Sequence, residues 1–224
     1  MDKKKLFFRI NNLFIFITMV IAAITVMTYG SRGTRIDGTV TEHWQQIFTF
    51  TLLSNIFLGI VALIAAIMSF KNKPLTGKIS TFYLAAASSA ALTFLTVVLF
   101  LAPMRAMNGK NYFDMLLEPM FFLHFLNPVL SIITFIFLFP GRIKKWKPQF
   151  LSLIPVLIYG IAYVTCVVII KIAPDFYGLT FGGRYFLVPL VFLLFAAIVF
   201  GISTLLTFLH NHYLKTTNKN NRQD

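Results

Sequence analysis

The sequence contains a single cysteine, Cys166, and only seven acidic residues against 20 basic ones. One cysteine excludes an internal disulfide, and Cys166 lies in an apolar run without the spacing of metal ligands. We therefore expect neither a metal site nor a cofactor. The net charge of +13 can indicate a nucleic-acid-binding protein, but the basic residues cluster between apolar runs instead of covering one face of a domain. This pattern argues against nucleic acid as a partner and indicates membrane topology.

Charged residues of both signs make up only 12% of the chain, and 58% of its 224 residues are hydrophobic. A soluble domain is roughly 45–50% apolar. With so little polar surface, the chain cannot cover a globule that faces water on all sides. The composition therefore predicts an integral membrane protein whose main partner is the lipid bilayer.

The apolar runs are each close to the roughly 20 residues that a helix needs to cross a bilayer. We predict one all-α domain over residues 1–224 with six transmembrane helices, at about 10–29, 47–70, 79–102, 119–139, 150–173 and 185–209. The first run follows a basic head, as in a signal peptide, but the later charge pattern requires it as an uncleaved helix. The polar tail from His210 is expected to fray in solvent.

The basic residues also predict how the helices are oriented. Fourteen of the 20 fall in the head, the second and fourth connections, and the tail, whereas six fall in or beside the other three connections. Because basic segments are retained on the cytoplasmic side, both termini are expected to be cytoplasmic. The scarcity of cysteine and the abundance of Lys, Asn and Phe favour a bacterial plasma membrane.

The fourth apolar run, residues 117–139, carries a histidine inside its apolar part. An ionisable group in hydrocarbon is costly without a partner, so an intramembrane histidine is a functional hypothesis by default. Three further residues lie three, four and seven positions after it, which places all four on one side of a helix. These residues are His124, Asn127, Pro128 and Ser131.

A second polar stripe, formed by Thr51, Ser54 and Asn55, begins the second span and is the best candidate to face the first. If both spans start on the outer side, Thr51 lies about 6 Å deep and His124 about 7 Å deep at 1.5 Å per residue. A hydroxyl and an imidazole at one depth predict a two-residue catalytic site. The imidazole accepts the threonine proton as the oxygen attacks an ester carbonyl, and later protonates the leaving alcohol.

Each of these residues also has a structural interpretation. The Thr51 hydroxyl can bond the carbonyl four residues back, and His124 can hold the bundle together through an interhelical hydrogen bond. The four pocket candidates, Ser54, Asn55, Asn127 and Ser131, can serve packing alone, although Asn55 or Asn127 can also orient the imidazole or donate to an oxyanion. Asp114 and Glu118 are candidates for a third, orienting residue, but loop carboxylates in solvent are expected there. His210 and His212 are expected on a solvated surface.

At these positions the chain resembles a known family. Six spans, Trp44 then Thr51 at the start of the second, and His124 before Pro128 in the fourth look like the androgen-induced protein family. The segments FTLLSN, residues 50–55, and HFLNP, residues 124–128, are most similar to its bacterial six-pass branch. The resemblance covers most of the chain in topology and rests on these short motifs.

Animal members of that family are intramembrane threonine hydrolases of fatty-acid esters of hydroxy fatty acids. The resemblance implies that Thr51 is the nucleophile and His124 the general base. The animal proteins have an acidic residue three positions after the threonine, where this chain has Ser54. Thr49 is close enough to be an alternative nucleophile.

The resulting first hypothesis is a lipid-ester hydrolase with an apolar substrate and its site near the outer leaflet. The second is a non-catalytic transporter or substrate-binding membrane subunit whose pocket is lined by the same polar stripes. The third is a structural or partner-binding membrane protein.

Overall fold

The computed structural model describes residues 3–30, 32, 35, 37–117, 120–143 and 146–220, with side chains as far as 217. Within these ranges the chain is helical and contains no strand. Its α-helices are α1 (Lys3–Tyr29), α2 (Phe50–Phe70), α3 (Lys78–Thr96), α4 (Ala102–Met107), α5 (Asn127–Ile133), α6 (Lys147–Leu151), α7 (Ile154–Tyr163) and α8 (Leu187–Asn220). Four π-helical turns lengthen these helices, at Val97–Leu101, Phe122–Leu126, Thr134–Leu138 and Val164–Ile169, and short 3₁₀ turns lie at His43–Phe48 and Tyr112–Met115.

Five continuous helical segments of the described chain are long and apolar enough to cross a membrane. They are Lys3–Tyr29, Phe50–Phe70, Lys78–Met107, Lys147–Ile169 and Leu187–Thr217, and a shorter apolar helix, Phe122–Leu138, occupies the predicted fourth span. The all-α fold of an integral membrane protein is therefore confirmed. The fourth span is shorter than the predicted 119–139, and the position of its predicted first residue, 119, lies outside the described residues.

The C-terminal segment differs from the expectation, because α8 continues through the polar residues after 209. His210 is fully buried, not solvated. Its ring packs on Phe135, with centroids 5.2 Å apart, and its two nitrogens lie 3.1 Å from Ile136 O and 2.8 Å from Gly141 O. This contact with the end of the fourth span holds the last turns of α8 in place. His212 is exposed, as expected.

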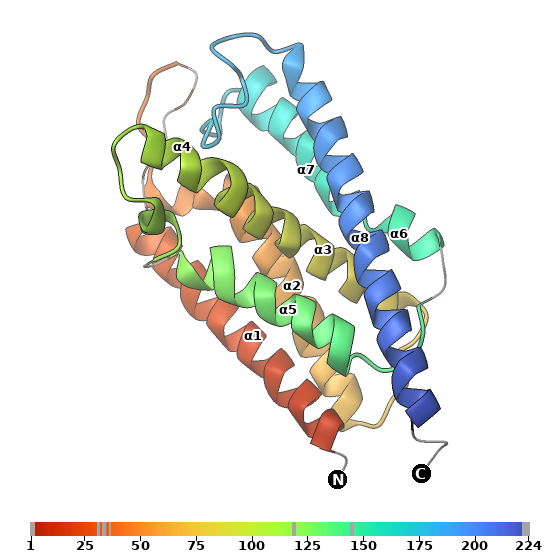
Figure 1. The fold of residues 1–224 in the computed structure, drawn as a ribbon. Helices are drawn as coiled ribbons and strands as arrows, with labels where there is room; N and C mark the ends of the chain where they lie inside the picture. Colours follow the sequence, from red (N-terminus) through yellow and green to blue (C-terminus); the bar gives the residue numbers. More distant parts are fainter. Residues whose placement is uncertain are drawn as a thin grey trace.

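In the centre of the bundle lies α3, which contacts α2 and α5 on one side and α7 and α8 on the other (Figure 1). Its run of alanines and serines makes this possible, because small side chains let helices approach closely in lipid. Ala86, Ala87 and Ala90 are fully buried and share a core with Phe135 and Phe139.

The start of α1 and the end of α8 lie at the same end of the bundle, which we call the terminal end (Figure 1). The connections that follow α1, α4 and α7 gather at the other end, the distal end (Figure 1). Both termini lie at one end because the chain runs the length of the bundle an even number of times. The cytoplasmic location of the terminal end stays a prediction from the charge pattern.

Candidate functional site

The π-helical turn Phe122–Leu126 carries His124 and leaves one backbone carbonyl without a backbone donor. In this turn the Asn127 N–H donates to the carbonyl five residues back, not to that of Leu123 four residues back. The next possible donor to Leu123 O belongs to Pro128, which has no N–H. The turn therefore needs a donor from elsewhere in the bundle.

Asn55 of α2 supplies that donor. Its Nδ2 lies 3.0 Å from Leu123 O and also donates to Thr51 O at 2.8 Å. The Asn55 side chain is fully buried, so neither bond competes with water. One amide thus joins the turn that holds Thr51 to the turn that holds His124, and the two motifs noted in the sequence meet at this contact.

Thr51 lies in the first turn of α2, two residues after the N-cap residue Thr49. The Thr49 hydroxyl donates to Gln46 O at 2.7 Å and accepts the Leu52 N–H at 3.3 Å, so it is used in capping. The Thr51 hydroxyl instead lies 3.3 Å from the hydroxyl of Tyr177. Of the two threonines, Thr51 has the hydroxyl that is not occupied by the helix cap.

Tyr177 reaches Thr51 from the connection between α7 and α8. The Thr51 N–H, one of the donors left without a partner at a helix start, donates to the Tyr177 oxygen at 3.2 Å. The phenol proton is then available for the Thr51 oxygen. Burial raises the pKa of the Tyr177 phenol above its ordinary value, so this group keeps its proton and stays a donor at neutral pH.

Asp175 holds this connection in shape. Its carboxylate accepts the Leu179 N–H at 3.0 Å, the Thr180 N–H at 3.1 Å and the Thr180 hydroxyl at 2.7 Å. It also accepts a hydrogen bond from the Tyr163 hydroxyl. These bonds fold the connection into a compact loop anchored to the end of α7, and they fix the backbone beside Tyr177.

His124 is buried, with 5% of its surface exposed, and its Nδ1 lies 2.6 Å from Met115 O. A carbonyl oxygen only accepts, so Nδ1 carries the proton of a neutral ring and Nε2 keeps its lone pair. This is the tautomer that a general base needs. The backbone carbonyl of Met115 here holds the imidazole in the way that a carboxylate does in a catalytic triad.

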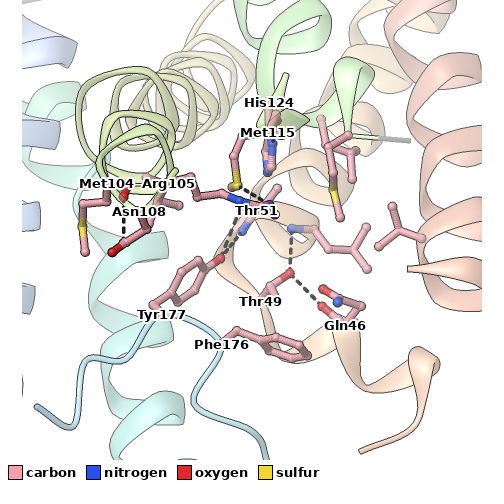
Figure 2. Close-up of a pocket in the computed structure, with 15 residues that line it drawn as sticks. Gln46, Thr49, Thr51, Met104, Arg105, Asn108, Met115, His124, Phe176 and Tyr177 are labelled. Carbon is pink, nitrogen blue, oxygen red and sulfur yellow. Dashed lines mark hydrogen bonds between the residues drawn. The ribbon is translucent and has the colours of Figure 1, made fainter. Parts of the chain in front are cut away.

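Thr51 and His124 line the same cavity, which has a volume of about 320 Å³ and lies at the distal end (Figure 2). Tyr177 and Arg105 also line it, and Figure 2 shows the Tyr177 hydroxyl directed toward Thr51. Arg105 Nη1 donates to the Met115 sulfur at 3.2 Å, which is a weak acceptor for a guanidinium. The cavity therefore brings together a hydroxyl, an imidazole, a phenol and a cation.

The other predicted pocket residues lie beneath this cavity. Ser54 bonds Thr51 O at 3.1 Å and the Thr93 hydroxyl at 3.0 Å. Asn127 accepts the Thr18 hydroxyl proton at 2.7 Å, and Ser131 donates to Pro128 O at 2.7 Å. All three are buried; the bond of Ser54 to Thr93 joins α2 to α3, that of Asn127 to Thr18 joins α5 to α1, and that of Ser131 stays within α5.

Asp114 is exposed in the 3₁₀ turn Tyr112–Met115, and Glu118 lies outside the described residues. Among the described residues, no three or more His, Cys, Asp or Glu side chains gather where they could hold a metal.

Sequence reasoning missed Tyr177, Arg105 and Met115. It counted Arg105 only among the basic residues that predict orientation, and it assigned no role to the loop that carries Tyr177. Only Asp175 offered a clue, because an aspartate shortly before glycine and threonine residues favours a loop closed on its own backbone.

Comparison with protein-family models, with curated proteins and with solved structures gave no match for this chain. Fold and cavity define an all-helical integral membrane protein with a cavity at the distal end of its bundle that is lined by both apolar and polar side chains. The resemblance to the androgen-induced protein family stays a prediction from the two short motifs.

Proposed function

We propose that this protein is an intramembrane lipid-ester hydrolase with Thr51 as nucleophile and His124 as general base. The observation that carries the proposal is that both side chains line one cavity, with the imidazole held at Nδ1 so that Nε2 is the basic nitrogen. The family resemblance points to the same two residues. The composition favours a bacterial plasma membrane, and the charge pattern favours a cavity near its outer leaflet.

In the proposed reaction, His124 Nε2 takes the Thr51 hydroxyl proton while Oγ1 attacks the ester carbonyl carbon. The carbonyl oxygen becomes an oxyanion. The Tyr177 hydroxyl and the Thr51 N–H, which bond each other in the structure, are donors beside the nucleophile that can turn to this oxyanion. When the oxyanion collapses, the alkoxy group leaves with the proton from Nε2, and the acyl group stays on Thr51. Water activated by Nε2 then attacks the acyl carbon, which releases a fatty acid and restores the threonine.

A fluorophosphonate probe tests the proposal, because it phosphonylates an activated hydroxyl. We expect purified wild-type protein to be labelled, the label to map to Thr51 by peptide mass spectrometry, and labelling to vanish in Thr51→Ala and in His124→Ala. Thr28→Ala is the matched control, since the Thr28 hydroxyl bonds carbonyls of its own helix, those of Ile24 at 2.8 Å and Thr25 at 3.2 Å. Folded wild-type protein that stays unlabelled contradicts the hydrolase and favours a pocket that binds or transports without turnover.

Because Arg105 lines the cavity, we expect the proposed substrate to carry an anionic group that binds its guanidinium. A hydrogen bond to a charged group contributes about 1.5–3 kcal/mol, which is roughly a 10- to 100-fold change in binding. Arg105→Gln should therefore raise KM by at least about tenfold for an ester that also carries a free carboxylate. It should leave KM unchanged for the methyl-capped form of the same ester. An equal rise in KM for both esters would show that Arg105 only supports the structure through its contact with Met115.

A further inference from the structure

A second cavity, with a volume of about 420 Å³, lies at the terminal end and shares no lining residue with the first. Three lysines line it: Lys4 and Lys5 from the start of α1, and Lys73 from the connection between α2 and α3. Apolar side chains also line it, including Phe8 and Leu138. This cavity thus combines three cationic side chains with apolar ones, and it has no role in the proposed hydrolysis.

The charge of the lysines is not offset by nearby described carboxylates. Every acidic residue of the described chain, namely Asp37, Glu42, Asp114 and Asp175, belongs to the connections at the distal end. Lys5 donates to the side-chain amide oxygen Oδ1 of Asn72, and Lys4 lies 5.0 Å from the centre of the Tyr213 ring. These two contacts hold the ammonium groups of Lys5 and Lys4 at the cavity.

The backbone that carries Lys73 is fixed by the end of α2. Asn72 adopts a left-handed conformation, with φ of 52°. The Lys73 N–H donates to Met68 O at 2.8 Å, and the Asn72 N–H donates to Ser69 O at 3.2 Å. This pair of bonds is a Schellman motif, in which asparagine takes the position usually held by glycine.

Arg9 braces the same turn from α1. It is buried, with 8% of its surface exposed, and its Nε donates to the Ser69 hydroxyl at 3.1 Å. Its guanidinium also lies over the Phe70 ring, 4.7 Å from the centroid. The wall of the cavity is therefore held by interactions between α1 and α2 in addition to the helix cap.

We propose that this cavity binds the phosphate headgroup of an anionic phospholipid, with an acyl chain against Phe8 and Leu138. The cavity lies where two apolar helices end in lysines, which is the level of the headgroups in a bilayer. Basic pockets between transmembrane helices are suited to anionic headgroups. The apolar lining favours a lipid over free phosphate, because inorganic phosphate makes no use of a hydrophobic surface.

The test measures lipid affinity by native mass spectrometry and by thermal shift of the full chain in a neutral detergent. We expect phosphatidylglycerol to bind at least tenfold more tightly than phosphatidylcholine. The combined variant Lys4→Gln, Lys5→Gln, Lys73→Gln should lose that preference. The combined variant Lys78→Gln, Lys147→Gln, Lys215→Gln removes the same charge from exposed positions outside the cavity and should keep it.

Equal losses in the two combined variants would overturn the proposal in favour of general electrostatic attraction. A shift of the same size with inorganic phosphate alone would overturn it in favour of a free-anion site, and no preference for phosphatidylglycerol would overturn it outright. If the cavity variant does not fold, Lys73→Gln alone decides, since its side chain is exposed and it should weaken phosphatidylglycerol binding severalfold.

Discussion

Ester hydrolysis by the purified protein should fall by roughly 10²–10⁴-fold when either Thr51 or His124 is replaced with alanine. It should fall no further when both are replaced. A nucleophile and its base act as one unit, so once either is lost, replacing the other causes no further loss of activity. The measurement is kcat/KM for a fluorogenic fatty-acid ester in detergent micelles, for the two single variants and the double variant.

Stability must be followed in the same variants. Thr51→Ala loses a hydroxyl contact with Tyr177 that contributes about 0.5–1.5 kcal/mol, so its melting temperature should fall by only a few degrees. Thr28→Ala should keep full activity. Additive losses in the double variant would contradict a shared catalytic step and would assign the two residues separate, structural effects.

The sequence was sufficient for the fold class because composition reports directly on the solvent that surrounds a chain. Apolar runs of bilayer length predicted the helices, and the polar stripes of Thr51 and His124 predicted two surfaces that line one cavity. Helix ends were less accurate. The polar tail was expected to fray, yet His210 is buried against Phe135, a contact between residues 75 positions apart that no local pattern encodes.

The cavity also combines residues that local sequence predicted with residues that only tertiary contacts bring there. Periodicity placed Thr51 and Asn55 on one side of a helix, but Tyr177 reaches Thr51 from 126 residues away through a loop that Asp175 folds. Met115 holds His124 through its backbone carbonyl, a group that every residue has, so no side-chain pattern can identify this contact. Local sequence thus predicted two residues of the cavity lining, Thr51 and His124, and the rest of the lining depended on tertiary contacts.

Replacing Asn55 with leucine should cost about 1–3 kcal/mol, because Leu123 O would remain buried without a donor. The variant should also lose more activity than its unfolded fraction explains, since the amide joins the turns of Thr51 and His124. Asn12→Leu is the matched control: Asn12 is equally buried and also makes two side-chain bonds, to Phe8 O and the Tyr83 hydroxyl, but at the terminal end. It should lose stability without this excess loss of activity.

Pro128 makes the role of Asn55 testable in a second background. Pro128→Ala restores a backbone N–H at the position from which a π-helical turn can supply a donor to Leu123 O. Asn55→Leu should then destabilise the Pro128→Ala protein by at least about 1 kcal/mol less than it destabilises the wild type, measured by thermal unfolding as a double-mutant cycle. Additive changes would show that Asn55 does not act through this carbonyl, because two residues that serve the same acceptor cannot be independent.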